Sequence, residues 1–165
     1  MELLQELSFA NTQSINCPLN RSGIIKILAS GELAAGGRDR GLIIRFNRNA
    51  DPESYQSFTH MGGHDGTPEW AHNMMPREEG FDTGICTGRN GWYLDATFML
   101  EYTLSINPNF LKVTGSGLSS FALGDNRFLG YEGHGVFVTN TPVSEIEVGF
   151  TGGAVRTGDL RIYHM

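Results

Sequence analysis

The sequence predicts an all-β protein, an antiparallel β-sandwich of jelly-roll-like type. Runs of β-branched and aromatic residues are separated by turn residues at about 8–12-residue spacing, which is typical of sandwiches and barrels. Glycine contributes 22 of the 165 residues, and with proline it interrupts almost every window long enough for a helix. Many corners of such a fold need a positive φ, which glycine adopts freely. This length favours a single domain over residues 1–165.

The N-terminal third contains three predicted strands and one ambiguous segment. Residues 3–7 are leucine-rich and fit either one or two helical turns or a strand. Two β-branched runs, 23–29 and 42–46, flank a polar glycine-rich turn, so we expect them to pair as a hairpin. Alternating polar and aromatic residues over 55–59 predict the next strand.

The strongest periodic pattern covers residues 92–106. One face carries only apolar side chains, from Trp92 to Ile106, while the other is mostly polar, as in a half-buried strand. We expect Trp92 to lie in the core. Asp95 and Glu101 share the polar face, but they lie roughly 20 Å apart along a strand and cannot form an acid–base pair.

The rest of the chain shows shorter strand patterns and one irregular region. Gly115 to Gly117 is expected to be a short turn. Residues 62–91 are rich in glycine, proline and polar residues, and predict a long irregular loop inside the domain, which is often a functional feature. The remaining predicted strands cover residues 110–113, 119–123, 135–139, 144–150 and 159–163.

Two groups of side chains are candidate sites. Histidines and a carboxylate gathered near the start of the irregular loop suit Zn²⁺ or Mn²⁺, although their spacing matches no zinc motif and a hydrogen-bonded polar loop is the alternative. These candidate metal ligands are His60, His64, Asp65 and His72. No other cofactor is expected.

A ligand site is predicted from aromatic and polar residues in loops. A tryptophan in a polar loop is either a plug in the core or a platform for sugar rings, which stack on indole. The second polar loop, 124–134, is either a hairpin turn with its corner at Asp125–Asn126 or a ligand or inter-subunit contact. The candidate ligand-binding residues are Trp70, Asp125, Asn126, Arg127, Tyr131 and Glu132.

Charge and cysteine content exclude several classes of protein. The net charge of −6 and a pI of about 5.3 lack the basic patch that nucleic acid binding needs. Cys17 and Cys86 cannot form a zinc-finger site; they are two free thiols or one disulfide. The acidic start of the sequence predicts no secretory signal, and no apolar run is long enough to insert into a membrane.

Residues 92–165 resemble the C-terminal β-sandwich domains of bacteriophage tailspikes and tail fibres. The resemblance rests on the long apolar strand to Ile106, the corner 107–109 (Asn-Pro-Asn) and the short final strand 158–163. It implies a jelly-roll-like domain, often trimeric, that binds cell-surface polysaccharide or completes a spike. The expected location is therefore virion-associated or extracellular without a signal peptide, and otherwise cytoplasmic.

Three functions remain open at this point. The favoured one is a carbohydrate-recognition or receptor-binding domain that binds polysaccharide without turnover. The alternatives are a structural module for oligomerisation or capping of a virion assembly, and a small metal-dependent hydrolytic enzyme that uses the segment from His60 to His72. No catalytic residue is assigned, since no known catalytic motif occurs.

Overall fold

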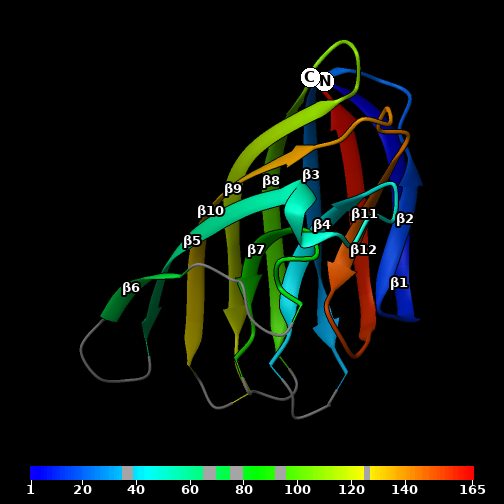
Figure 1. Cartoon of the computed structure of the whole chain (residues 1–165). Coiled ribbons are helices and arrows are strands. Elements are labelled where there is room, and N and C mark those ends of the chain that lie inside the picture. The colour runs from blue at the N-terminus through cyan, green and yellow to red at the C-terminus, as the bar shows by residue number, and fades with distance from the viewer. Residues whose placement is uncertain (35–38, 65–69, 75–79, 92–95, 125–126) are drawn as a thin grey trace.

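The chain folds as an antiparallel β-sandwich, as the sequence predicts (Figure 1). The computed structural model describes residues 1–34, 39–64, 70–74, 80–91, 96–124 and 127–165. In this part of the chain, an eight-stranded sheet has the order β1-β12-β3-β8-β9-β10-β5-β6, and a four-stranded sheet has the order β2-β11-β4-β7. The strands of the larger sheet are β1 (Glu2–Thr12), β3 (Gly23–Leu33), β5 (Tyr55–His64), β6 (Trp70–Met74), β8 (Thr97–Ile106), β9 (Lys112–Ala122), β10 (Phe128–Val138) and β12 (Val155–His164). Those of the smaller sheet are β2 (Ser14–Pro18), β4 (Gly41–Phe46), β7 (Ile85–Arg89) and β11 (Glu145–Phe150), and a 3₁₀ turn, η1 (Pro52–Ser54), precedes β5.

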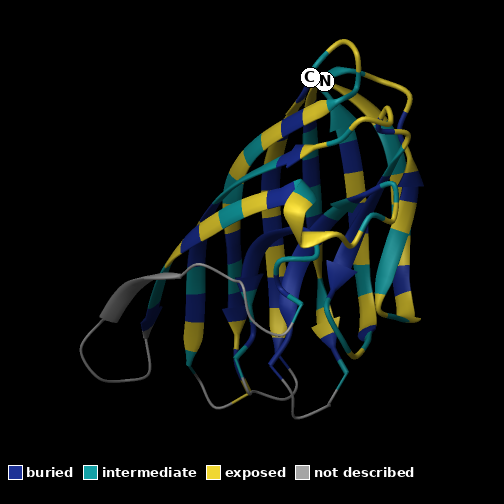
Figure 2. Ribbon diagram, viewed as in Figure 1, coloured by how far each residue is buried: buried dark blue, intermediate teal, exposed yellow. Residues whose placement is uncertain are grey.

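One hydrophobic core fills the space between the two sheets. Strand β8 alternates between exposed and buried residues along its whole length, which confirms the period-two pattern of the sequence over residues 97–106. The same alternation gives the larger sheet its banded exposure (Figure 2). Phe98 and Phe121 pack edge-on against Phe150, whereas Phe46 stacks on Phe137, and both arrangements suit the ring quadrupoles.

Three of the four strands of the smaller sheet are buried on both faces, and the edge strand β2 is more exposed. Strands β4, β7 and β11 are buried at nearly every position. On the side away from the main core, Phe81 forms a second cluster with Ile43 and Cys86, and the Arg45 guanidinium bonds Thr83 of the same covering segment. Residues 80–84 therefore act as a lid over this sheet.

Three expectations about the strands are wrong. The runs at 23–29 and 42–46 do not pair as a hairpin, because β3 bonds β12 and β8 while β4 bonds β11 and β7 in the other sheet. Both runs have an apolar face, and each buries it against the other sheet. Residues 62–91 are not one irregular loop, since they contain the end of β5 together with β6 and β7.

The third correction concerns Gly115 and Gly117, which lie inside β9 and not in a turn. The Tyr102 side chain lies against both glycines: a Cβ at either position would be 2.6 Å from its ring. A Cβ on Gly117 would also lie 2.2 Å from the Glu101 carbonyl oxygen. These glycines therefore make room for a neighbouring strand, a role that a sequence pattern does not distinguish from a turn.

The N-terminal segment is strand β1, which settles the ambiguity of residues 3–7. It pairs only with β12, and β2 pairs only with β11. Glu2 lies opposite His164, so the two ends of the chain are side by side (Figure 1). The described residues include no helix long and apolar enough to cross a bilayer.

Candidate functional site

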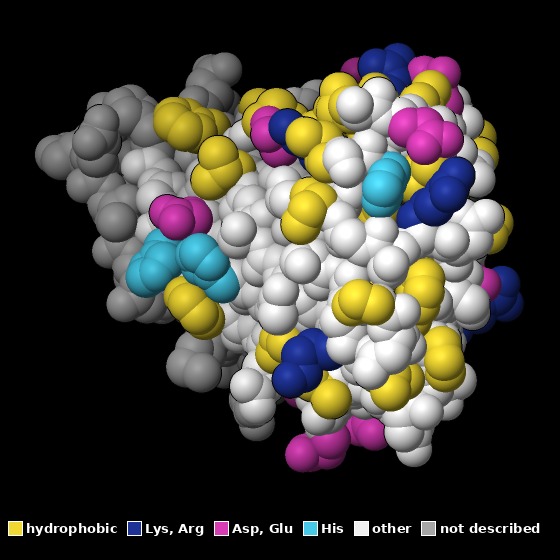
Figure 3. Space-filling model, turned by 90° about the horizontal axis from the view of Figure 1, so that it is seen from above, with side chains coloured by type: hydrophobic (Ala, Val, Ile, Leu, Met, Phe, Trp, Pro, Cys, Tyr) yellow, Lys and Arg dark blue, Asp and Glu magenta, His cyan; other side chains and the backbone are white. Residues whose placement is uncertain are grey.

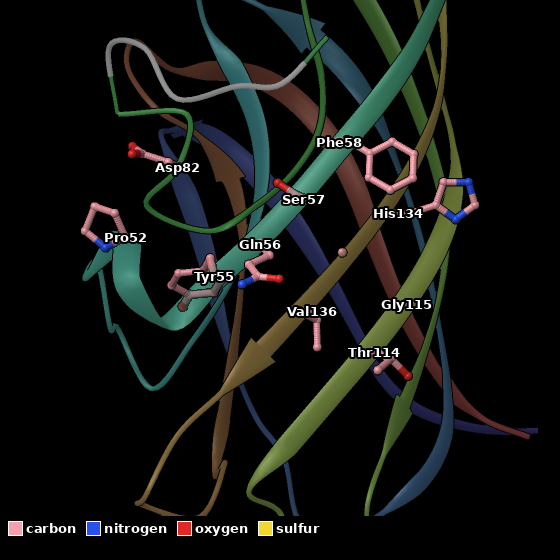
Figure 4. Close-up of a pocket in the computed structure, with 11 residues that line it drawn as sticks. Pro52, Tyr55, Gln56, Ser57, Phe58, Asp82, Thr114, Gly115, His134 and Val136 are labelled. Atoms are coloured by element: carbon pink, nitrogen blue, oxygen red, sulfur yellow. The ribbon is translucent and has the colours of Figure 1, made fainter. Parts of the chain in front are cut away.

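A hollow with a volume of about 480 Å³ lies at β5, β10 and β9. This volume is in the range of pockets that hold small ligands. Its lining combines outward-facing residues of the three strands with residues that alternate with them, namely Tyr55, Ser57, Gly115 and Gly135. Pro52 and Asp82 lie at the end away from Phe58 (Figure 4). The outward-facing strand residues that line the hollow are Gln56, Phe58, Thr114, His134 and Val136.

Backbone register explains why these side chains meet. Phe58 lies opposite His134, and Gln56 lies opposite Val136, which in turn lies opposite Thr114. Residues directly opposite in neighbouring strands point to the same face of a sheet. The outer face of the larger sheet therefore presents an aromatic ring and an imidazole next to an amide and a hydroxyl.

An exposed aromatic pair occupies one end of the hollow. The Phe58 ring stacks on the His134 ring at 5.0 Å between centroids and 27° between planes, and Figure 4 shows the two rings side by side. His60 packs edge-on to Phe58 at 5.6 Å. Phe58 is 43% exposed, so the sheet holds this ring in place without burying it.

A carboxylate extends this group along β10. Glu132 lies opposite His60, and its Oε1 is 3.4 Å from His134 Nε2. Viewed from above, histidine, acidic and apolar side chains lie together on the surface (Figure 3). The group offers hydrogen-bond donors and acceptors around an apolar ring, which is the composition of a site for a polar organic ligand.

One predicted ligand-binding residue is not available to a ligand. Tyr131 is 3% exposed, packs edge-on against Phe121, and donates its hydroxyl hydrogen bond to the Arg89 carbonyl oxygen at 2.7 Å. Its burial raises the pKa of the phenol. Position 131 alternates with exposed Glu132, so the strand turns the ring into the core. Tyr131 is a structural residue, and its proposed role in a ligand platform is wrong.

The other predicted ligand-binding residues are only partly placed. Arg127 accepts a backbone hydrogen bond from Leu123 at 2.8 Å, which closes the β9–β10 connection as a hairpin. Asp125 and Asn126 at its corner lie outside the described residues. Trp70 lies in β6 opposite Gly63, and its side chain lies outside the described part, as does Trp92. Among the predicted residues whose side chains are described, Glu132 joins the group around Phe58.

The predicted metal ligands are only partly placed, because His60 is the one member of the set whose side chain is described. Met61 lies opposite position 72, while His60 lies opposite position 73. The side chains at positions 64 and 72, like residue Asp65, lie outside the described part of the structure. The described residues contain no group of three or more metal-ligating side chains.

Neither thiol has the character of a nucleophile. Burial raises the pKa of Cys17 to about 11 and that of Cys86 to about 12, so both are protonated at neutral pH. Both cysteines are free. They lie on β2 and β7, the opposite edges of the smaller sheet, which resolves the choice between thiols and disulfide.

Sequence reasoning missed Phe58, Gln56, Thr114 and His134 as site residues. The signal was present in part, because the alternation over 55–59 places Gln56 and Phe58 on one face. What the sequence did not supply is the partner strand, since β5 and β10 are far apart in the chain. Searches against family models, curated proteins and solved structures gave no significant match, so the resemblance to tailspike and tail-fibre domains stays a prediction.

Proposed function

We propose that this β-sandwich is a carbohydrate-recognition domain whose site is the hollow over β5, β10 and β9. The observation that carries the proposal is the Phe58 ring, held 43% exposed beside polar side chains. The C–H face of a sugar ring stacks on such a ring, and its hydroxyls need both donors and acceptors nearby. Gln56, Thr114 and Glu132 supply these groups from rigid strands, which lowers the entropic cost of binding.

The proposal describes binding without turnover. Both described thiols are buried and protonated, so neither is available as a nucleophile. The ligand class is a cell-surface polysaccharide, and the setting is the virion, as the resemblance of residues 92–165 implies. The site itself is argued from Phe58 and its neighbours, and does not depend on that setting.

A glycan array tests this proposal, followed by calorimetry on the glycans that bind. We expect Phe58→Ala to weaken binding by about tenfold, because an aromatic contact contributes about 1 kcal/mol or more. Leu3→Ala is the matched control: Leu3 is also exposed, at 48%, but lies on β1 at the far edge of the same sheet. Absence of any binding on the array, or equal losses in both variants, would overturn the proposal.

A second candidate is a structural module that joins copies of this chain. Strand β1 is an edge strand of 11 residues without proline or lysine, the residues that commonly protect such edges from pairing. Met99, Leu118 and Phe128 are also about half exposed on the outer face. Light scattering tests this candidate: a trimer or dimer at micromolar concentration supports it, and a monomer at all concentrations removes it.

A further inference from the structure

A second hollow lies on the same outer face, at the other end of β10. Its volume is about 340 Å³, and its lining includes Met99, Ser120, Ala122 and Phe128. Phe128 is 52% exposed. Two half-exposed phenylalanines therefore lie along the outer face of β10. Phe128 belongs to β10 itself, and Phe58 belongs to β5, where it lies opposite His134 of β10.

The floor beside the second hollow has almost no side chains. Gly62, Gly130 and Ser120 lie opposite one another on β5, β10 and β9. A Cβ on Gly130 would meet no atom within 4 Å, so nothing in the fold requires glycine there. Gly117 of β9 differs, since a Cβ would collide with a neighbouring strand. The glycine at 130 leaves open space on the outer face.

The row between the two hollows combines two polar residues with one exposed leucine. It consists of His60, Glu132 and Leu118, which lie opposite one another. His134, the partner of Phe58, lies six positions after Phe128, which is roughly 20 Å along a strand. This length exceeds the size of one sugar ring, so a single ring cannot contact both phenylalanines.

Charge narrows the class of ligand. Strands β5 and β10 contain no lysine and no arginine, and Glu132 places a carboxylate in the middle of the row. The carboxylates of an acidic polysaccharide would be repelled by Glu132, because like charges repel. Neither strand offers a guanidinium or ammonium group to offset this repulsion. An uncharged polysaccharide meets no such electrostatic repulsion.

We propose that the two hollows are the ends of one extended binding surface along β10, and that it takes an uncharged oligosaccharide of several units. This inference rests on the proposed function and adds the length and charge of the ligand. Phe58 binds one end of the chain, Phe128 the other, and Glu132 with His60 bonds hydroxyls between them. Because Gly130 has no side chain, the oligosaccharide can lie across the sheet at this position.

The test compares chain lengths by calorimetry, with the disaccharides and hexasaccharides of the cello-, malto-, xylo- and manno-series as probes. We expect at least one hexasaccharide to bind about tenfold or more tightly than its disaccharide, because a second aromatic contact adds about 1 kcal/mol. Phe128→Ala should remove this advantage and leave disaccharide binding unchanged, whereas Phe58→Ala should weaken both. Gly130→Val should weaken only the hexasaccharide, and Leu3→Ala should change neither.

The outcomes separate this inference from the proposed function. Equal affinity for short and long probes, or a Phe128→Ala variant that keeps the advantage of length, overturns the extended surface and leaves the Phe58 site standing. Failure of every probe and of the glycan array overturns both. Tighter binding of an acidic probe such as hexagalacturonic acid overturns the uncharged ligand. A wild-type oligomer that Phe128→Ala converts to monomers would assign this face to a second copy, which also overturns the inference.

Discussion

The outer faces of the two sheets differ: that of the smaller sheet is covered, and that of the larger sheet is open. The smaller sheet is covered by residues 80–84, with Phe81 packed on Ile43 and Cys86. The larger sheet leaves its outer face open, and that face holds both hollows described above, with Phe58 and Phe128 half exposed. The outer face of the smaller sheet is covered by a buried aromatic ring, while the outer face of the larger sheet carries two half-exposed ones.

This difference indicates where stability and binding can be changed independently. Hydrophobic burial is the dominant stabilising contribution to folding, and the smaller sheet collects it on both faces. An open face with half-exposed rings adds less to stability. Its residues can therefore serve ligand binding without a large effect on folding. Changes in the lid should therefore affect unfolding, and changes on the open face should affect ligand binding.

The largest effect is expected for Phe81→Ala. Phe81 is 1% exposed, and truncating a buried phenylalanine costs about 3–5 kcal/mol of unfolding free energy. Phe58→Ala, on the open face, should cost about 1 kcal/mol or less, mainly through its contact with His134. Urea denaturation of both variants measures the difference, and equal losses would contradict the contrast between the sheets.

A smaller difference in stability is expected between substitutions at two glycines of the larger sheet. Gly117→Ala places a methyl group 2.2 Å from the Glu101 carbonyl oxygen, and such overpacking costs about 1–3 kcal/mol. Gly130→Ala meets no atom within 4 Å, so its urea midpoint should equal that of the wild type. A destabilised Gly130→Ala variant would show that this position supports the fold and is not open floor.

The thiols of the smaller sheet give a dependence on alkaline pH. Burial raises the pKa of Cys17 to about 11 and of Cys86 to about 12, from the usual 9.0. A folded pKa above the unfolded one means that the stabilisation is complete below pH 9 and is lost as pH rises through the folded values. The urea midpoint should therefore be flat between pH 7 and 9 and fall above that. Cys86→Ala should show a shallower fall, and an identical profile would exclude this thiol as a cause.

The smallest effect concerns an ion pair on the open face. Arg161 Nε donates to Glu6 Oε1 at 2.8 Å, with both side chains about half exposed. Solvent and salt screen such pairs, and most contribute little. Glu6→Gln should leave the melting temperature unchanged at physiological salt. A clear decrease would mean that β1 is held in place by charge as well as by its pairing with β12.

Local patterns predicted the fold class and much of the core. The alternation in β8 correctly identified Phe98, Leu100 and Tyr102 as inward-facing, because side-chain direction in a strand depends only on position parity. The pairing of strands was less predictable. Glycine at 115 and 117 is typical of a turn, and only the Tyr102 ring on the adjacent strand explains it as part of β9.

The candidate site was predictable to a lesser extent, because it depends on which strands become neighbours. Glu132 was singled out from its local sequence and does lie beside His134. Tyr131 was singled out for the same reason, yet it faces the core, since its direction depends on which face of β10 meets the smaller sheet. Phe58 and His134 are 76 positions apart in the chain, and only the β5–β10 register brings their rings into contact.

The position of the two last strands has a consequence for how this protein is made. Strand β12 lies between β1 and β3, and β11 lies between β2 and β4. On the ribosome, β1 and β2 therefore have no partner among the described strands until β11 and β12 have emerged, and the closing contacts join strands that are far apart in the sequence. Such non-local pairing makes folding slow and leaves unpaired edges exposed during synthesis. Nascent chains that stop short of β11 should consequently depend on chaperones, and a ribosome that stalls there would present β1 and β2 to other chains.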